Sequence, residues 1–465
     1  MKRKSLSEEE NLFRERENLD EKKKKKKNNK KQVTTTGILT NTSCQVAGLR
    51  VTLPEDLIGE VLSYLTVKSL MRMKCVNKSW KTLISDPIFV KMHLMRSPRN
   101  THFVLPFVNN YRGLSRFVSA NILPISVSHF LKSWRTTVIR LTEDPYRRFR
   151  SKDLRRIVGS CNGLICLLDS STSSADYVEH SYSLYFWNPA TRTKSEKLGF
   201  IGNNRNFHTF DSAMFTFGCD NSTDTYKVVW LNFDKDNCYN YNRSIRTTVK
   251  VFTLGDNVWR DIDCFPVVLV DYPDCLVQHD GVYFSDAINW LVYHEYNCHL
   301  KNLMIREHVI VSLDLGTETY SQLLLPQCCN NEMSVDPTPA LFVFMDCLCL
   351  SYDFEKTYFV IWQMKEFGVE ESWTQFLKIS YLDLNINISD LEYGMRLFPL
   401  CFSDDDALIL GNNFGYAPIL YDWRNNRVKI IKSTKFGDKT NHGTICYDDW
   451  YHAKEYSVES LVSPC

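Results

Sequence analysis

A unit of strand, polar turn and strand recurs five times between residues 184 and 431 and constrains the fold of the chain more than any other feature. The turn-side residues of successive units are spaced by 65, 61, 49 and 59 positions. Each unit is too small to bury both faces of its own strands, so units of this kind stack around a common axis. The five units are LYFWNPATRTKSEKLG (184–199, with Trp187), VKVFTLGDNVWRDI (249–262, with Phe252), VIVSLDLGTETYSQLLLP (309–326, with Leu313), YFVIWQMKEFGVEESWTQF (358–376, with Trp362) and PILYDWRNNRVKII (418–431, with Tyr421).

This repeat predicts a β-propeller over residues 96–432. The spacing slightly exceeds the roughly 50 residues of a kelch blade and the roughly 40 to 45 of a WD40 blade. An aromatic content of 13% also favours strands. A pair of packed β-sheets with fortuitous hairpins remains the alternative. Residues 433–465 follow as a C-terminal segment for which disorder is left open.

A different pattern precedes the repeats, in the stretch LPEDLIGEVLSYLTVKSL that starts at Leu53. At 100° per residue its large aliphatic residues fall on one arc of a helix. Pro54 and the acidic residues after it favour a helix start at about Pro54. Two shorter helices are predicted over 67–76 and over the segment that starts at Asn77 and stops before Pro87.

Three helices in so few residues, without disulfides or a metal, form a bundle below the size at which a core is usually self-sufficient. The apolar arc is therefore predicted to be covered by a partner protein. The alternative is that the helices pack on the β-rich remainder as a subdomain.

The run LPEDLIGEVLSYLTVKSLMRMKCVNKSWKTLISDPIFVKMHL (53–94) resembles the F-box of plant proteins, and residues 49–95 are assigned to it. The leading Leu-Pro, V-K-S-L, K-C-V-x-K-S-W and I-S-D-P-x-F occur in order, although Thr66 and Asn77 depart from common family residues. The resemblance implies docking on a Skp-type adaptor, which bridges the F-box to the cullin and RING subunits of a ubiquitin ligase. The family's apolar adaptor-binding positions fall on Leu53, Pro54, Leu57, Ile58, Val61, Leu62, Leu65, Leu70, Val76 and Trp80.

The repeat region resembles the kelch-like F-box-associated domain of the same plant family. The phrases GSCNGLICL (159–167), WNPATR (187–192) and FGCDNSTDTYKVV (217–229) match it in order, with Gly218 expected at a tight turn. The expected fold is thus α+β and multidomain, with a small three-helix F-box followed by a mostly β, propeller-like domain. The implied function is the substrate-recognition subunit of a ubiquitin ligase. The alternative is a module that binds a glycan, a small molecule or a protein without directing degradation.

No catalytic constellation, metal site or cofactor motif is recognised, so the chain is predicted not to be an enzyme. HEYNCH (294–299) places its second His five positions after the first, whereas the zinc motif H-E-x-x-H needs four. The 16 cysteines contain no C-x-x-C pair. G-x-S-x-G and phosphate-loop motifs do not occur.

Target capture is predicted in the longer polar connections, because binding residues usually lie on loops of a rigid scaffold. The segments are 170–182, 203–212, 234–243 and 294–302. The candidate target-binding residues are Tyr177, His180, Arg205, His208, Tyr239, Tyr241, Arg243, His294 and Tyr296.

Residues 1–48 are predicted to be a disordered, charged tail. Residues 1–36 carry a net charge of +6, whereas the other 429 residues carry −4. The KKKKKKNNKK run (22–31) is either a nuclear-import signal or merely solvated. The acidic remainder makes nucleic-acid binding unexpected. No secretory signal or membrane span is recognised, which predicts a location in the cytoplasm, the nucleus or both.

Overall fold

The structure of the chain is a computed structural model, and Asp56–Cys465 form one compact unit in it. The residues that the structure describes are 54–108, 120–126, 138–141, 149–151, 154–173, 179–203, 213–234, 246–263, 265–266, 280–298, 303–326, 339–402, 407–412, 418–430, 433–436, 443–445 and 454–464. The predicted charged tail lies outside them.

Four short helices open the described chain: α2 (Glu55–Leu62), α3 (Val67–Met73), α4 (Lys78–Ser85) and α5 (Pro87–Arg96). Side-chain oxygens of Thr66, Asn77 and Asp86 cap the last three by accepting backbone N–H bonds. The predicted third helix stops before Pro87, as expected. Pro87 then occupies the first turn of an additional helix, where its missing N–H is harmless.

The remaining elements are strands, apart from the 3-10 turn η4 (Glu370–Ser372) and the short helix α8 (Ile388–Glu392). The strands of the first half are β1 (Arg99–Val108), β2 (Ala120–Ser126), β3 (Val138–Leu141), β4 (Phe149–Ser151), β5 (Leu154–Cys161), β6 (Leu164–Ser173), β7 (Glu179–Asn188), β8 (Thr193–Lys194), β9 (Leu198–Asn203), β10 (Ala213–Asp220), β11 (Thr225–Asp234), β12 (Arg246–Thr253) and β13 (Trp259–Asp261).

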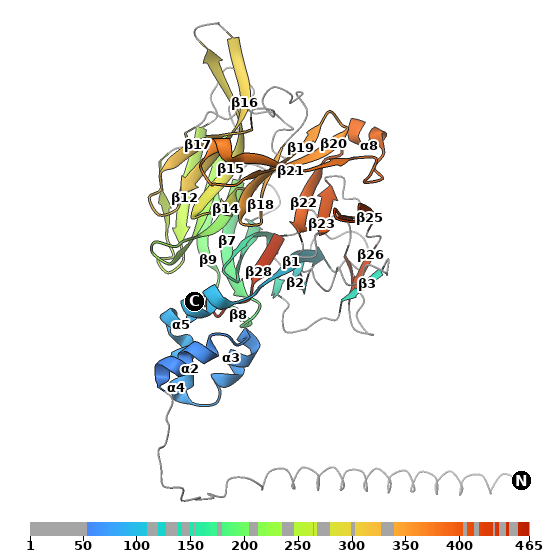
Figure 1. The fold of residues 1–465 in the computed structure, drawn as a ribbon. Helices are drawn as coiled ribbons and strands as arrows, with labels where there is room; N and C mark the ends of the chain where they lie inside the picture. The colour runs from blue at the N-terminus through green and yellow to red at the C-terminus, as the bar shows by residue number, and fades with distance from the viewer. Residues whose placement is uncertain are drawn as a thin grey trace, which may run out of the picture. The chain divides into compact units, whose positions relative to one another are not determined.

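The second half adds a further set of strands, and β15 and β16 form the longest hairpin in Figure 1. These strands are β14 (Val282–Phe284), β15 (Ala287–Cys298), β16 (Leu303–Asp314), β17 (Tyr320–Leu324), β18 (Ala340–Phe344), β19 (Cys347–Phe354), β20 (Tyr358–Met364), β21 (Trp373–Ser380), β22 (Leu397–Phe402), β23 (Ala407–Asn412), β24 (Ile419–Asp422), β25 (Arg427–Ile430), β26 (Ser433–Phe436), β27 (Gly443–Ile445) and β28 (Lys454–Val458).

Six antiparallel sheets form the blades of a propeller (Figure 1). Their strand orders are β28-β1-β2-β4, β5-β6-β7-β8 (with β9 on β7), β10-β11-β12-β13, β14-β15-β16-β17, β18-β19-β20-β21 and β22-β23-β24-β25. The first strands contact one another in a closed ring, in the order β28, β5, β10, β14, β18, β22 and back to β28. A separate small sheet has the order β27-β26-β3.

The repeat in the sequence corresponds to the third strand of a blade. Trp187, Phe252, Leu313, Trp362 and Tyr421 lie on β7, β12, β16, β20 and β24, each of which is third in its sheet. The expected mostly β, propeller-like fold is therefore confirmed, and the alternative of two packed sheets is excluded.

The chain closes its own ring through a late segment. Strand β28 pairs with β1, with Val458 opposite Arg99 and Tyr456 opposite His102. Beyond it, Ser460, Leu461 and Val462 are buried. Disorder had been left open for 433–465, and the structure corrects it for residues 454–464, which are part of the fold.

Many blade turns share one design. Asn188, Asp220 and Asp314 each end a strand, and their Oδ1 atoms accept bonds from the backbone N–H groups two and three residues on. Such side-chain bonds hold a tight turn without a partner strand. Gly218, by contrast, lies within β10 and not at a turn, and a Cβ there would overlap the ring of Tyr283.

Candidate functional site

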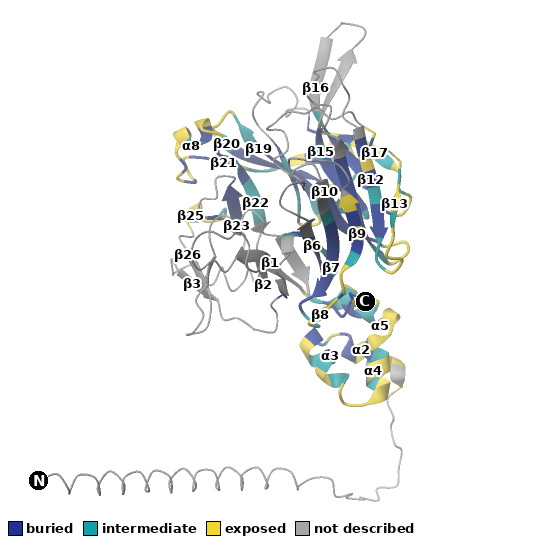
Figure 2. Cartoon of the chain, turned by 180° about the vertical axis from the view of Figure 1, so that it is seen from behind, coloured by how far each residue is buried: buried dark blue, intermediate teal, exposed yellow. Residues whose placement is uncertain are grey.

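The predicted adaptor-binding residues fall into two groups in the helices. Leu57, Val61 and Val76 are exposed by 51%, 67% and 66%, whereas Leu62 and Leu70 are buried. Figure 2 shows exposed positions along α2 and α4 beside buried ones. Pro54 is exposed, and Leu53 lies outside the described residues.

The buried group holds the helices together and does not face solvent. Leu62 and Leu70 pack with Val67, Ile84 and Phe89, and Ile58, Leu65 and Trp80 pack partly against them. The single arc read from the sequence is therefore shared between the bundle core and the surface. Leu62 and Leu70 are therefore not open to a partner. The partly buried Ile58, Leu65 and Trp80 can still contribute to an adaptor-binding face.

The sequence prediction missed three exposed large apolar or aromatic side chains of the helical region, namely those of Tyr64, Ile88 and Met95. Tyr64 is 68% exposed and lies in the turn directly after α2, where its N–H donates to the Val61 carbonyl at 3.4 Å. We call Leu57, Val61 and Tyr64 the α2 stripe. The guanidinium of Arg96 on α5 lies 4.8 Å from the Tyr64 ring centre and 2.8 Å from Glu60 Oε1, which fixes the end of the stripe.

The blade topology defines two edges of the propeller. In each antiparallel sheet the turns between strands one and two and between strands three and four lie at one edge. Lys91 of α5 pairs at 2.7 Å with Asp224, in the turn between β10 and β11, so we call this the helix edge. Connections between strands two and three, and from one blade to the next, leave from the opposite edge, the loop edge.

All four segments predicted to capture a target are bracketed by strand ends at the loop edge. Each segment lies at the end of β6, β9, β11 or β15, strands that run away from the helix edge. The prediction that all four are irregular connections is corrected, because residues 170–173 and 179–182 belong to β6 and β7 and residues 294–298 belong to β15. Sequence alone could not show this common edge. Tyr177, Arg205, His208, Tyr239, Tyr241 and Arg243 lie outside the described residues, while His180 is on β7 and His294 and Tyr296 are on β15, with side chains that the structure does not describe. Their role stays a prediction.

The sequence prediction did not include a further connection at the loop edge, in which exposed and buried apolar residues alternate along the chain. Residues 381–396 join β21 to β22, and they expose Leu382 by 71% and Tyr393 by 82%. Leu384, Ile386, Leu391 and Met395 of the same segment are buried in the adjoining core. The hydroxyl of Tyr381 donates to Asp353 Oδ2 at 3.0 Å. Leu382 and Tyr393 are thus exposed on a segment whose other apolar side chains are packed in the core.

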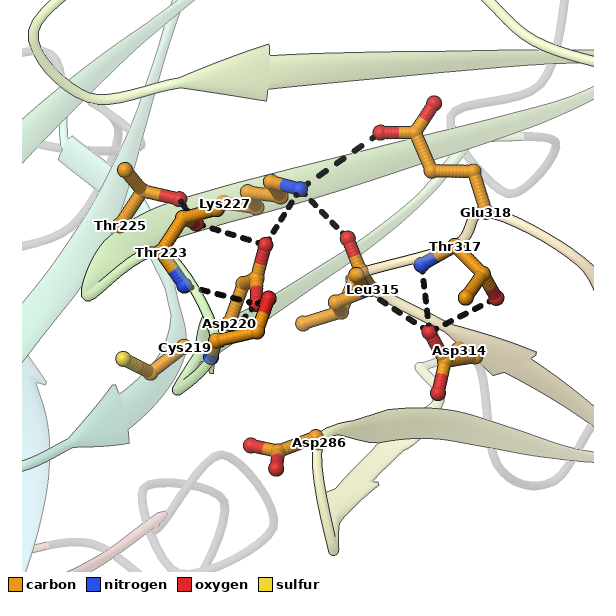
Figure 3. A network of polar contacts seen from close by, with 12 residues as sticks. Cys219, Asp220, Thr223, Thr225, Lys227, Asp286, Asp314, Leu315, Thr317 and Glu318 are labelled. Atoms are coloured by element: carbon orange, nitrogen blue, oxygen red, sulfur yellow. Dashed lines mark hydrogen bonds and ion pairs between the residues drawn. The ribbon is translucent and has the colours of Figure 1, made fainter.

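A buried polar network joins two blades at the helix edge (Figure 3). The Lys227 ammonium lies 3.0 Å from Asp220 Oδ2 and 3.6 Å from Glu318 Oε1, and it donates to the Leu315 carbonyl at 2.5 Å. Glu318 also pairs with Arg260. Burial alone would raise the pKa of Asp220, but bonds from Ser222, Thr223 and Lys227 lower it overall. Asp220 therefore stays ionised, and the network is structural.

The helices and the propeller share apolar contacts as well as the Lys91 ion pair. Val90 of α5 packs against both the helix core and the core of the second and third blades. Ala190, in the turn after β7, packs against the helix core. The connection from α5 to β1 consists only of Ser97 and Pro98. The helix edge is thus where the two regions meet.

The described residues were compared with the metal-site patterns considered in the sequence. They contain no group of three or more His, Cys, Asp or Glu side chains placed to hold a metal ion. The HEYNCH residues 294–298 lie on strand β15, so a zinc motif that needs one helix face is not formed there. No helix within the described ranges has the length and apolar character of a membrane span.

Comparison with known proteins gives matches over both regions. A family model for the F-box domain matches residues 52–92, and one for the F-box associated beta propeller domain matches residues 118–463. An F-box/kelch-repeat protein of Arabidopsis thaliana is 26% identical over 420 residues, covering 89% of this chain and 96% of the relative. The F-box protein CPR1 of Arabidopsis thaliana is 26% identical, covering 82% and 84%. Among solved structures, the beta-propeller domain of the Trilobed protease from Pyrococcus furiosus aligns at 8% identity with a TM-score of 0.32, covering 72% of this chain and 93% of that one.

Proposed function

Because the chain belongs to the family of F-box proteins that carry an F-box associated beta propeller domain, we propose that it is the substrate-recognition subunit of a Skp–cullin–F-box type ubiquitin ligase. The proposal rests on the observation that two candidate binding surfaces lie in different regions of the molecule. An exposed apolar stripe lies on the F-box helices, and the long connections leave the propeller at the opposite edge.

The α2 stripe supports docking on a Skp-type adaptor, as an F-box domain generally implies. Leu57, Val61 and Tyr64 are each more than half exposed, on a bundle whose own core is already filled by other side chains. Neighbouring exposed aliphatic and aromatic residues on a helix and the turn that follows it are typical of a surface that a partner covers. Through the adaptor, the chain would join the cullin and RING subunits.

The loop edge supports capture of a protein target. It offers the predicted connections together with Leu382 and Tyr393, which are the two most exposed large apolar side chains described in the propeller. Aromatic residues on a packed segment favour binding hot spots. The chain itself would perform no chemistry and would hold the target near the activated ubiquitin, which converts a bimolecular attack into a local one.

Reconstitution tests this proposal. The full chain is expected to co-purify with a Skp-type adaptor, to join a cullin–RING assembly and to become ubiquitinated in it. An F-box-deleted chain, used as bait with the proteasome inhibited, should retain captured targets. Adaptor binding without ubiquitin transfer would contradict the proposal and would indicate a binding module that does not direct degradation.

We also propose that the protein works in the cytoplasm or the nucleus, with the lysine run at 22–31 as an import signal. Replacing Lys22–Lys27 by Gln in a fluorescent fusion should shift the signal toward the cytoplasm. An unchanged distribution would mean that the run is only a solvated tail.

A further inference from the structure

Asn188 begins a blade turn in the same way as Asp220 and Asp314 do, but its side chain carries an amide nitrogen where theirs carry a second carboxylate oxygen. Its Oδ1 accepts from the N–H groups of Ala190 (2.9 Å) and Thr191 (3.2 Å). The Oδ1 atoms of Asp220 and Asp314 accept in the same way in their turns. The turn itself therefore needs only an acceptor, which Asp or Asn supplies equally well.

The amide nitrogen of Asn188 is used elsewhere. Nδ2 donates to the carbonyl oxygens of Ser460 (3.0 Å) and Val462 (2.8 Å), some 270 residues later in the chain. Asn188 is fully buried. An Asp at this position would place a carboxylate oxygen against two carbonyl oxygens in a buried site, which is strongly unfavourable. The choice of Asn over Asp thus serves the contact with residues 460–462.

The segment that Asn188 holds reaches into both regions of the molecule. The side chain of Leu461 is buried among Leu62, Leu70 and Phe89 of the helices. The side chain of Val462, the next residue, is buried in the core of the second and third blades. One short segment therefore contributes to two cores that lie on either side of the helix edge.

Further bonds fix the segment in place. The Ser460 hydroxyl donates to the carbonyl of Asn162 at 2.6 Å, in the turn between β5 and β6, and accepts from the N–H of Val462 at 3.2 Å. Ser460 is fully buried. Strand β28, which immediately precedes it, is the first strand of the ring-closing blade. The position of Leu461 is thus set by the propeller, although its side chain packs with the helices.

We propose that Asn188 is a positioning residue that clamps residues 460–462 and thereby sets the orientation of the F-box helices on the propeller. The other links are the exposed Lys91–Asp224 pair, the two-residue connection, and the contacts of Val90 and Ala190, which are only partly buried. An exposed pair of this kind contributes little. The clamp supplies the second, buried point of attachment that a fixed orientation needs.

The consequence for function rests on the proposed ligase role. A target at the loop edge reaches the activated ubiquitin only if the propeller is held at a constant angle to the adaptor. Misplacement by about 1 Å can cost about 100-fold in rate when reacting groups are brought together by a scaffold. The clamp would therefore be needed for transfer and not for adaptor binding or target binding.

The test uses the full chain co-expressed with a Skp-type adaptor. Asn188→Asp keeps the turn acceptor and removes the two N–H donors. Asp314→Asn is the matched change at a side chain whose hydrogen bonds go to Gly316 and Thr317 of its own turn. A second variant, Leu461→Ala, keeps Asn188 and removes the Leu461 side chain from the helix core. It tests the same contact if Asn188→Asp does not fold. Spin labels are introduced as noncanonical amino acids at the exposed positions Lys78 and Glu355, because the 16 cysteines preclude thiol labelling.

The distance distribution between the labels is expected to be narrow in the wild type and in Asp314→Asn, and broad in Asn188→Asp and Leu461→Ala. Adaptor co-purification should be unchanged in all four. Self-ubiquitination in the reconstituted ligase should fall about tenfold or more in the two clamp variants. Distributions as narrow as the wild type in both clamp variants would overturn the clamp. Absence of ubiquitin transfer in the wild type would instead overturn the ligase role and leave the distance result to decide the clamp.

Discussion

The helices and the propeller solve the same packing problem in opposite ways. Each blade buries its faces against the next blade, and the ring has no free end. The helices are too few to do this, so their core includes Leu461 from the far end of the sequence, and the α2 stripe stays uncovered. The core of the helices is complete without the α2 stripe, so the exposure of these apolar side chains points to a surface that a partner protein covers.

The largest expected effect separates the α2 stripe from the helix core. Replacing Leu57 and Val61 by Asp should abolish adaptor co-purification, since each aliphatic side chain covered by a partner contributes about 1.5 to 3 kcal/mol. The thermal unfolding of the chain should hardly change, because both side chains are exposed. Leu70→Ala, inside the same helices, should instead cost about 2 to 5 kcal/mol of stability. Undiminished co-purification of the Asp variant would contradict the stripe as the adaptor face.

The second prediction concerns the buried network of the propeller. Lys227→Met removes the cation between Asp220 and Glu318, and breaking a buried pair in this way costs about 3 to 5 kcal/mol. Lys250→Met breaks the more exposed pair with Asp261 on the same blade and should cost at most about 1 kcal/mol. Urea unfolding of both variants measures the difference. Equal costs would mean that the network of Figure 3 does not stabilise the blades.

A third prediction compares the two regions through one histidine of each, the buried His93 and the partly buried His308. Burial lowers the pKa of His308 on β16 to about 4, and burial also lowers the pKa of His93 on α5, against a bond to the Leu65 carbonyl that raises it. The folded state therefore binds fewer protons than the unfolded state below pH 6.5, so stability is present above that pH and is lost as the pH falls.

For His308 the loss should reach about 3 kcal/mol between pH 6.5 and about 4. Urea unfolding of the wild type and of His308→Gln over this range isolates the contribution, and His93→Gln does the same for the helices. A pH dependence that is identical in wild type and both variants would exclude titration of these histidines as its cause.

The smallest expected effect lies at the loop edge. Leu382→Ala and Tyr393→Ala should each weaken target capture by about 1 to 2 kcal/mol, as truncated contact residues in an interface commonly do. Stability should stay within about 0.5 kcal/mol, since both side chains are exposed. The captured set, compared by mass spectrometry with Leu384→Ala as the buried counterpart, checks this. A set that is unchanged in both surface variants would remove residues 381–396 from the target surface.

The propeller was predictable from sequence because its repeats carry local signals. Third-strand residues such as Trp187 and Tyr421 recur at blade spacing, and each blade is specified by its own segment. The helices were predictable as elements for the same reason. Pro87 shows the limit, since a proline that ends one helix also begins the next.

The distribution of the helical arc could not be predicted in the same way. Leu57 and Leu62 are chemically alike and lie at the two ends of the predicted arc of α2, and the sequence does not say which end packs against α3 and α4. The role of residues 460–462 was equally hidden, because their partners Asn162 and Asn188 lie about 270 to 300 positions away. Contacts at such separation leave no pattern in a local window of sequence.

The place of Leu461 in the helix core also has a consequence for synthesis. Leu62 and Leu461 are 399 residues apart. At about 5 to 20 residues per second, the F-box helices leave the ribosome roughly 20 to 80 seconds before the residue that completes their core. During that interval the first blade also lacks β28. A nascent or prematurely terminated chain therefore presents F-box helices that lack Leu461 and are not yet held on the propeller by residues 460–462. Ubiquitin transfer would then favour chains whose translation has finished.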